Sequence, residues 1–311
     1  MKARSYVLVT PVRNEEATIG STLDSVLHQT ILPREWVIVS DASTDHTDEI
    51  VKTYTRQNPL VRLLRLENRP VRNFASVVVA TELGIAALNT RDYDYLGLLD
   101  ADIRFGERYY ESILCRFSED PHLGVAGGWV IDCHEGRRSH AKQNFEEVAG
   151  AVQFFRRECF ESLGGLVALY EGGWDTITCV RARMNGFRTR TFPEIEVDHL
   201  KPRNWSAGTV VDRFRQYGER NYALGNHPIF ETVKCTYRCF QYPFFVLGFA
   251  QLAGYISCYL RRRSRVLSPE IVRFRRQEQM RRLFPFRNST LPPRQEMSSG
   301  CRTGHLVTRD E

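Results

Sequence analysis

The sequence of 311 residues lacks two features that would place it in common classes of secreted or metal-binding protein. No two of its eight cysteines have Cys-x-x-Cys spacing, and the closest two are Cys235 and Cys239. Their scatter argues against a zinc site or a disulfide framework and favours a reducing compartment. The N-terminus has only a four-residue apolar run, at 6–9, before charges resume. We therefore expect no signal peptide.

Most of the chain also lacks a surplus of positive charge. The formal net charge is +6, but the residues from Arg261 onward contain 13 arginines and five acidic residues. The residues before Arg261 carry a small negative charge. This argues against a nucleic-acid-binding body and predicts a basic C-terminal segment that meets an anionic surface such as lipid headgroups. With 42% hydrophobic residues, the chain is able to bury a large core.

The first hundred residues alternate between short β-rich runs and segments with helical spacing. The β-rich runs are 6–10, 36–40, 61–66 and 95–99. Apolar residues recur at helical spacing from Ile19 to Leu27, and between 74 and 88 at Val78, Val79, Leu83 and Ala86. This alternation predicts an α/β fold with a mostly parallel sheet flanked by helices. In such sheets, ligands bind at the carboxyl ends of the strands.

Polar clusters follow three of the predicted strands: "PVRNEE" after the first, "DASTD" after the second and "DAD" after the fourth. We expect them to converge in space. Asp100 and Asp102 are able to supply oxygen ligands to one Mg²⁺ or Mn²⁺, although strand-end acids also form Asx turns or cap helices. Asp41 is placed to accept from a base or ribose, and Asp45 is a helix N-cap candidate.

Five blocks in order carry a resemblance to a known family: "VLVTPVRNEEATI", "VIVSDASTD", "LLDADIRF", "LGGL" and "WDTITCVRARMNGF". Over residues 5–225 the chain resembles the family 2 glycosyltransferases, which are inverting enzymes with the GT-A nucleotide-sugar fold. The resemblance implies a nucleotide-sugar donor, a bound Mn²⁺ or Mg²⁺ and an acceptor hydroxyl. It also implies that Asp175 is the catalytic general base.

The predicted binding residues fall into three groups. The nucleotide and its phosphates would contact Pro11, Asn14, Glu15, Asp41, Arg72 and Asp100. The metal would be held by Asp100, Asp102 and His199, although a lone histidine is more often structural. The acceptor would contact Gly165, Gly173 and Trp174. Residues 213–225 are interpreted as a basic acceptor or diphosphate loop.

The sequence departs from the family pattern at two positions. Ser40 stands where the nucleotide motif usually has a first acid, and Trp174 replaces the Glu of the usual Glu-Asp pair. An aromatic side chain beside the base is able to stack on a sugar, and it also leaves open an altered acceptor site. Asp175 itself is retained, with helix capping or an ion pair with Arg181 as the alternative interpretation.

The last third contains 21 uncharged residues from Phe240 to Leu260, long enough to span a bilayer. A full crossing would export the basic tail, against the positive-inside tendency, so a re-entrant or interfacial helix is favoured. An apolar helix packed on the catalytic domain and an oligomer interface remain alternatives. A second helix is predicted after Ser268 as N-cap and Pro269 as first residue.

These patterns predict three parts: a catalytic domain at 1–232, a membrane-associated helical appendage at 233–284 and a disordered tail at 285–311. The predicted protein is an inverting glycosyltransferase on the cytoplasmic face of a membrane, docked through residues 240–284. A lipid-linked saccharide or polysaccharide is its expected acceptor. The alternatives are a nucleotidyltransferase, which would normally have a glycine-rich basic loop after the first strand, and a non-catalytic binding or scaffold protein.

Overall fold

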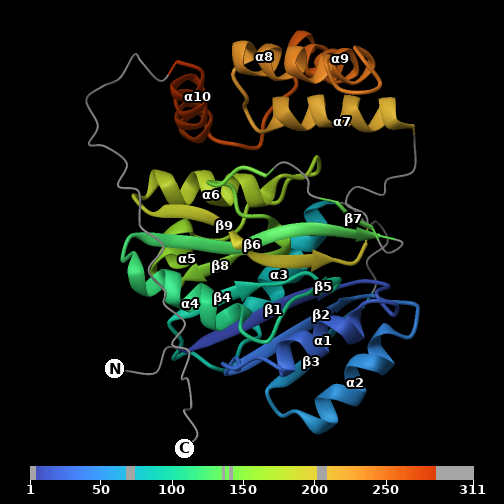
Figure 1. Cartoon of the computed structure of the whole chain (residues 1–311), viewed down its shortest axis with the longest axis vertical. Coiled ribbons are helices and arrows are strands. Elements are labelled where there is room, and N and C mark those ends of the chain that lie inside the picture. Colours follow the sequence, from blue (N-terminus) through green and yellow to red (C-terminus); the bar gives the residue numbers. More distant parts are fainter. Residues whose placement is uncertain (1–4, 68–73, 135–136, 140–142, 202–208, 285–311) are drawn as a thin grey trace, which may run out of the picture.

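A nine-stranded sheet occupies the centre of the protein, with the strand order β3-β2-β1-β4-β8-β6-β9-β5 and β7 paired to β6 (Figure 1). The computed structural model describes residues 5–67, 74–134, 137–139, 143–201 and 209–284. The strands are β1 (Tyr6–Val12), β2 (Glu35–Asp41), β3 (Val61–Leu66), β4 (Tyr95–Leu98), β5 (Ile103–Arg104), β6 (Leu123–His134), β7 (Arg137–Ser139), β8 (Phe154–Arg156) and β9 (Arg188–His199).

The predicted α/β class is confirmed, and β1 to β4 lie where the sequence places them. β1 pairs in parallel with β2 and β4, and β2 pairs in parallel with β3. Beyond β4 the sheet is more mixed than predicted, because β8 runs antiparallel to β4 and β6. β1 and β2 are apolar because both faces of the sheet are covered there. Trp36 is fully buried, and its indole N–H donates to Thr10 Oγ1 at 2.9 Å.

Helices cover the sheet: α1 (Ile19–Leu27), α2 (Thr47–Gln57), α3 (Phe74–Ala86), α4 (Tyr109–Glu119), α5 (Arg157–Leu163) and α6 (Trp174–Met184), with a 3-10 turn, η1, at Gly150–Val152. α1 buries Ile19, Leu23 and Val26, as its spacing predicts. α3 is apolar all round, and only one of its sides faces β1 and β2. Val78 is therefore buried, whereas Val79 and Leu83 are exposed, contrary to the predicted face.

Four further helices form a separate layer beyond α6, drawn in orange and red in Figure 1. They are α7 (Val210–Ala223), α8 (Pro228–Cys239), α9 (Val246–Leu260) and α10 (Pro269–Leu283). α7 and α9 pack closely because each has a glycine at their contact. A Cβ on Gly218 would collide with Gln251 O, and one on Gly254 would collide with Arg215 O.

A buried polar network joins these helices. Glu231 on α8 is fully buried, and its carboxylate accepts from Asn221 Nδ2 and Asn226 Nδ2 at 2.8 Å each, and also from Gln251 Nε2. Asn226 Oδ1 in turn accepts from two residues of α10, Arg275 and Gln279. Because buried polar groups are costly to leave unpaired, this network fixes the four helices to one another.

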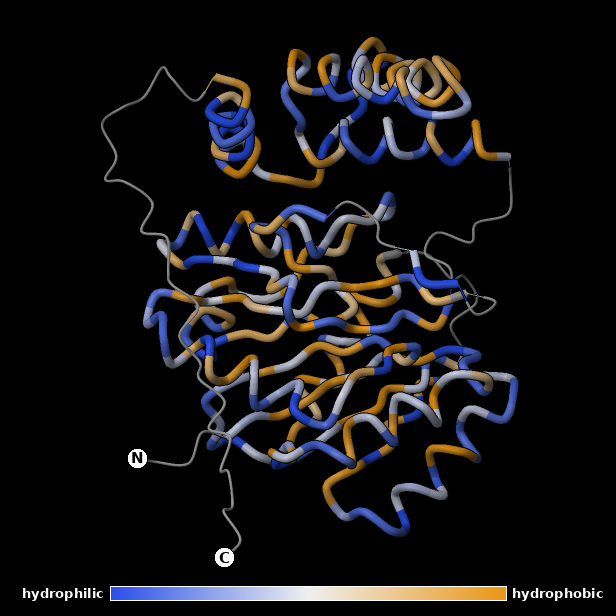
Figure 2. Tube along the Cα trace, viewed as in Figure 1, coloured by the Kyte–Doolittle hydropathy of each residue, from blue (hydrophilic) through white to orange (hydrophobic). Residues whose placement is uncertain are grey.

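The uncharged stretch 240–260 is not one helix. α8 ends at Cys239 and α9 begins at Val246, with turns between them. Among the described residues, no helix combines the length and the apolar character needed to cross a membrane. The hydrophobic residues of this layer appear as orange segments at the top of Figure 2, and Phe240, Tyr242 and Leu260 are at least 70% exposed.

The predicted start of the last helix is correct. Ser268 is the N-cap of α10, its side chain accepts from Ile271 N, and Pro269 is the first helical residue. The predicted domain boundary at residue 232 falls inside α8, so it does not mark a break between elements. The predicted tail, 285–311, lies outside the described residues.

Ion pairs hold α10 against α6 and the segment that precedes η1. Arg183 on α6 donates from Nε and Nη2 to the Glu278 carboxylate at 2.6 and 2.9 Å. Arg282 pairs with Glu146 at 2.9 Å, and Arg275 lies 4.0 Å from Glu147. Several arginines that the sequence suggests for an anionic surface therefore face glutamates of the same chain.

Candidate active site

Asp100, Asp102 and His199 come together at one edge of the sheet. Each offers a ligand atom, and these atoms all lie within 4.8 Å of one another. Both aspartates directly follow β4, and His199 ends β9, where it pairs with Ile103. His199 Nε2 is 3.6 Å from Asp102 Oδ2. The two strand ends therefore bring together the three predicted metal ligands.

The turn that carries the two aspartates is held by Thr22 of α1. Its hydroxyl donates to Ala101 O at 2.9 Å and accepts from Ile103 N at 3.1 Å. Asp100 N donates to Ala151 O at 3.0 Å. These bonds satisfy the turn's backbone groups and fix the spacing between the carboxylates.

The electrostatics of these carboxylates favour a positive partner. Burial raises the pKa of Asp100 to about 8, and the negative charges of Asp102, Glu15 and Asp175 add to the increase. Burial also raises the pKa of Asp102, although the His199 ring lowers it. Oxygen and imidazole donors in this arrangement suit a hard divalent cation. The residues therefore fit the predicted Mn²⁺ or Mg²⁺, and they do not distinguish between the two ions.

Asp175 lies at the start of α6, near the same cluster. Its Oδ2 accepts from Gly150 N at 3.2 Å, and its Oδ1 accepts from Thr176 N at 2.8 Å. Burial raises the pKa of Asp175, while these two backbone bonds and the Arg220 guanidinium lower it. The alternative of an ion pair with Arg181 is wrong, because Arg181 donates to the carbonyls of Leu163 and Gly165. The alternative of helix capping is also not met: the hydrogen bond from Thr176 N to Asp175 contributes to the start of α6, but the N-cap residue is Gly173.

Hydrogen bonds join the loops after β1 and β2, which carry the predicted nucleotide-binding residues. Asn14 Oδ1 accepts from Thr44 N at 2.8 Å, and Asn14 N donates to Ser43 Oγ at 3.2 Å. Asn14 has a positive φ of 56°, a conformation that asparagine tolerates better than most residues. Glu15 N donates to Thr47 Oγ1 at 2.8 Å.

Asp41 ends β2 beside these loops. It is buried, and its Oδ2 lies 3.5 Å from Arg13 Nη1. Pro11, on β1, is partly buried and pairs in register with Val39. Asp45 is not an N-cap: His46 occupies that position, and Asp45 accepts from Thr47 N at 3.1 Å. Arg72 lies outside the described residues.

The predicted acceptor residues have structural contacts of their own. Trp174 is partly buried, and a Cβ on Gly150 would lie 2.8 Å from Trp174 Cζ2, so the indole packs on the turn that holds Asp175. Gly173 and Gly165 have positive φ values of 90° and 100°. Their contacts with an acceptor remain predictions.

Sequence reasoning missed several residues that shape the site. Asp132 on β6 lies opposite His199 in the register, with its Oδ1 3.6 Å from His199 Nδ1. Lys201 pairs with Glu15 and also donates to Asn14 O at 3.4 Å. Residues 213–225, interpreted as a loop, mostly form α7, from which the Arg220 charge acts on Asp175. Of these residues, only Lys201 could have been found from a local sequence pattern, because it lies two residues after the predicted metal ligand His199.

Comparison with known proteins identifies the family. Residues 7–173, more than half of the chain, match the model described as glycosyl transferase family 2. The chain belongs to glycosyl transferase family 2. The resemblance stated from the five sequence blocks is therefore confirmed.

A curated relative extends the family match over most of the chain. The chain is 31% identical over 271 residues to the poly-beta-1,6-N-acetyl-D-glucosamine synthase of Staphylococcus aureus (strain COL). That match covers 79% of this chain and 61% of the relative, so the chain spans less than two thirds of that protein's length.

Two solved glycosyltransferase-type structures share the fold. The mannosyltransferase PcManGT from Pyrobaculum calidifontis, in complex with GDP-Man and Mn²⁺, has a TM-score of 0.54 at 18% identity, covering 92% of this chain and 82% of that one. S. aureus TarS 1–349 in complex with UDP-GlcNAc has a TM-score of 0.53 at 15% identity, covering 83% of this chain and 73% of that one. At these identities the likeness supports the GT-A type of fold and nothing finer.

Proposed function

We propose that this family 2 protein is an inverting glycosyltransferase that moves a sugar from a nucleotide-diphosphate sugar to an acceptor hydroxyl. The observation that carries the proposal is the meeting of Asp100, Asp102 and His199 within 4.8 Å at a strand edge, in a site whose charges include Asp175. Related proteins add support, because TarS and PcManGT bind UDP-GlcNAc and GDP-Man.

In this proposal the loops after β1 and β2 bind the nucleotide. Asp41 accepts from the base or ribose, and Pro11 and Asn14 shape the pocket between the loops. A divalent cation held by Asp100, Asp102 and His199 would offset the negative charge of the departing diphosphate. The interlocked hydrogen bonds of Asn14 with Ser43 and Thr44 hold this pocket ready before the donor arrives.

Asp175 is the proposed general base. Gly150 N and Thr176 N each donate a hydrogen bond to one oxygen of its carboxylate and fix its position. Because a carboxylate oxygen has two lone pairs, each oxygen still has one that can accept the proton of an attacking hydroxyl. Burial raises the pKa of Asp175, which makes its carboxylate a stronger base than that of an ordinary aspartate. A single in-line displacement needs no covalent intermediate and inverts the anomeric centre.

A growing polysaccharide or a lipid-linked saccharide is the proposed acceptor. The similarity to a poly-N-acetylglucosamine synthase supports a saccharide acceptor. The exposed apolar side chains around Phe240, Tyr242, Phe244, Phe249 and Leu260 support docking of residues 240–284 on the cytoplasmic face of a membrane.

Release of nucleoside diphosphate from UDP-, GDP- and dTDP-sugars, with Mn²⁺ or Mg²⁺ and native-like membranes, tests the proposal. We expect one donor to be turned over by the wild type and by neither Asp102→Ala nor Asp175→Asn. Nucleotide binding without release from any donor, in the presence of membranes and candidate acceptors, would favour a non-catalytic binding protein, a role to which the Trp174 replacement points. Formation of a nucleoside triphosphate and a sugar 1-phosphate when pyrophosphate is added to the nucleotide sugar would instead indicate a nucleotidyltransferase.

A further inference from the structure

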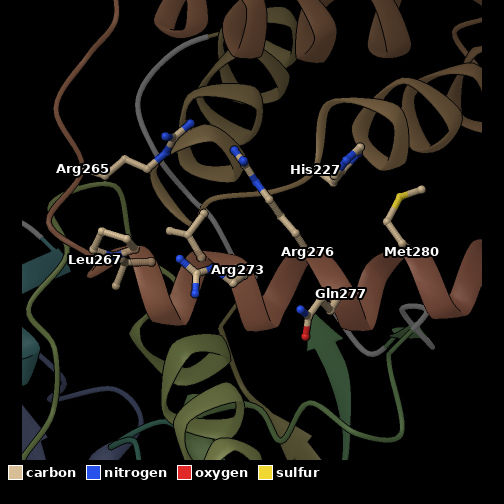
Figure 3. Close-up of a pocket in the computed structure, with 9 residues that line it drawn as sticks. His227, Arg265, Leu267, Arg273, Arg276, Gln277 and Met280 are labelled. Carbon is tan, nitrogen blue, oxygen red and sulfur yellow. The ribbon is translucent and has the colours of Figure 1, made fainter.

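A basic groove lies in the helical layer, apart from the site at the sheet edge. It encloses about 630 Å³ between α10, the segment that precedes it and the start of α8 (Figure 3). Arg265, Arg273, Arg276 and His227 contribute its polar side chains, and Leu267, Val272 and Met280 contribute apolar ones. The lining thus combines cationic groups with an aliphatic wall.

Two of the three arginines are fixed in place by their Nε atoms. Arg265 Nε donates to Tyr222 O at 2.8 Å, and its guanidinium lies 3.9 Å from the centre of the Tyr222 ring. Arg276 Nε donates to Gly225 O at 3.0 Å. Among the described residues, the Nη atoms of both side chains make no hydrogen bond or ion pair. The structure therefore presents their terminal N–H groups without an internal acceptor.

The groove also differs in charge from the rest of α10. Arg275 and Arg282 on the same helix face Glu147 and Glu146. Among the described residues no carboxylate lines the groove, and the pKa of His227 is lowered first by burial and then by the Arg276 charge. Three guanidinium groups, none paired with an acid in the described part of the chain, therefore form a site of excess positive charge.

The chemistry of the lining selects the class of ligand. Guanidinium groups bind phosphate oxygens through pairs of charge-assisted hydrogen bonds, and a phosphate has enough oxygens to serve several of them. A purely polar anion would leave the partly exposed Val272 and Met280 facing water, beside the buried Leu267. We propose that this groove binds the phosphate of a lipid, with the apolar part of the molecule against the aliphatic wall.

The surroundings favour a lipid over a soluble phosphate. Val266, between two of the lining residues, is 65% exposed, and Leu260 at the end of α9 is 75% exposed. Both side chains would gain from contact with an apolar chain. The inference concerns binding at a place distinct from the proposed donor site and does not depend on glycosyl transfer.

Titration calorimetry of the full chain with a short-chain phosphatidate, below its critical micelle concentration, tests the inference. We expect binding that weakens roughly tenfold in Arg273→Gln, which is about the effect of losing one charge-assisted hydrogen bond. Arg273 is exposed and makes no hydrogen bond or ion pair with the described residues, so its replacement should leave the fold and the thermal midpoint unchanged.

The matched control is Arg281→Gln, an exposed arginine on the same helix that does not line the groove. We expect its affinity to stay within about twofold of the wild type. A second groove variant, Arg265→Lys, keeps the charge but loses the planar fork, and should also weaken binding.

Comparing pyrophosphate with the phosphatidate distinguishes a soluble phosphate from a lipid phosphate as the ligand. Pyrophosphate should bind at least about tenfold more weakly than the phosphatidate, because it cannot use the aliphatic wall. Equal affinity for the two would overturn the lipid assignment. Equal losses in Arg273→Gln and Arg281→Gln, or no phosphatidate binding by the folded wild type, would overturn the site itself. None of these readouts involves a nucleotide sugar, so they stand whatever the outcome of the donor assay.

Discussion

The pKa of Asp175 is set by opposing influences, whose effects single substitutions can separate. Burial raises its pKa, and the Arg220 charge lowers it. On the proposed function Asp175 is a general base, which acts only when deprotonated, so activity should fall as the pH drops through this pKa. Because the pKa is raised, the acidic limb of kcat/KM should lie above pH 3.8, the ordinary value for an aspartate.

Replacing Arg220 with Gln should move that acidic limb to higher pH. Loss of the guanidinium charge removes a stabilising partner of the carboxylate, so the pKa of Asp175 rises further. The measurement is a pH profile of kcat/KM. The control is Arg215→Gln on the same helix, which pairs with Glu219 and should leave the limb in place. A limb that moves equally in both variants would argue against the assignment of Asp175 as the base.

Asp100 should destabilise the metal-free protein. Its pKa is raised to about 8, so folding takes up a proton on this group between its ordinary value of 3.8 and about 8. Stability is therefore lost as the pH rises through that window. In chelator near pH 8, Asp100→Asn should raise Tm by about 2–4 °C per kcal/mol of relieved burial cost and repulsion, and by less near pH 5.

The control for Asp100→Asn is Glu107→Gln, an exposed carboxylate whose loss should change Tm little at either pH. A Tm for Asp100→Asn that is lower than that of the wild type near pH 8 would show that the Asp100 carboxylate is stabilised by its contacts rather than destabilised by burial and repulsion.

At the scale of elements, local sequence patterns predicted much of the structure. β1 to β4, the face of α1 and the start of α10 at Ser268 and Pro269 follow from spacing and capping chemistry between neighbouring residues. The convergence of Asp100, Asp102 and His199 follows from the family resemblance and from the rule for strand ends. These features depend on residues close together in the sequence or on a recurring motif.

Other features depend on partners far away in the sequence, and no local pattern predicts them. Hydropathy treats 240–260 as one apolar segment, but it cannot anticipate that Gln251 bonds with Glu231 across two helices. Asp132 reaches His199 only because β6 and β9 pair in one register. The exposed side of α3 likewise depends on which strands it covers.

The α7–α9 contact gives a prediction at the same scale. Gly254→Ala should lower the free energy of unfolding by about 2 kcal/mol, because the added methyl meets the Arg215 backbone, which cannot move as a side chain would. The control is Gly20→Ala on α1, where an added Cβ has no heavy atom within 4 Å; there we expect no loss, or a gain of about 0.5 kcal/mol.

Chemical denaturation measures both variants. An equal and small effect of Gly254→Ala and Gly20→Ala would mean that α7 and α9 separate at little cost, and that the helical layer is held mainly by its polar network.

At the scale of the whole molecule, the Arg183–Glu278 pair ties the helical layer to the catalytic part. Both side chains are largely buried, at 12% and 16% exposure, and the contact is bidentate. A double-mutant cycle with Arg183→Gln and Glu278→Gln should give a coupling energy of about 1–3 kcal/mol. The cycle removes the separate bonds of Arg183 to Glu146 O and Thr189 Oγ1 from the result.

The comparison cycle uses Arg108 and Glu111, an exposed pair at i,i+3 on the surface. Its coupling should not exceed about 0.5 kcal/mol. If the Arg183–Glu278 coupling is as small, α10 is held by its contacts with α8 and the polar network rather than by this pair.

Lys201 connects the end of β9 to the loop after β1, where it neutralises Glu15. On the proposed function, a diphosphate that reaches this ammonium would replace a carboxylate as its partner. Donor binding would then be partly an exchange of counter-ions inside the protein rather than a gain of new charge pairs. The affinity for the donor should consequently fall less steeply with ionic strength than the number of its phosphate charges suggests, and removing Glu15 should restore the steeper dependence.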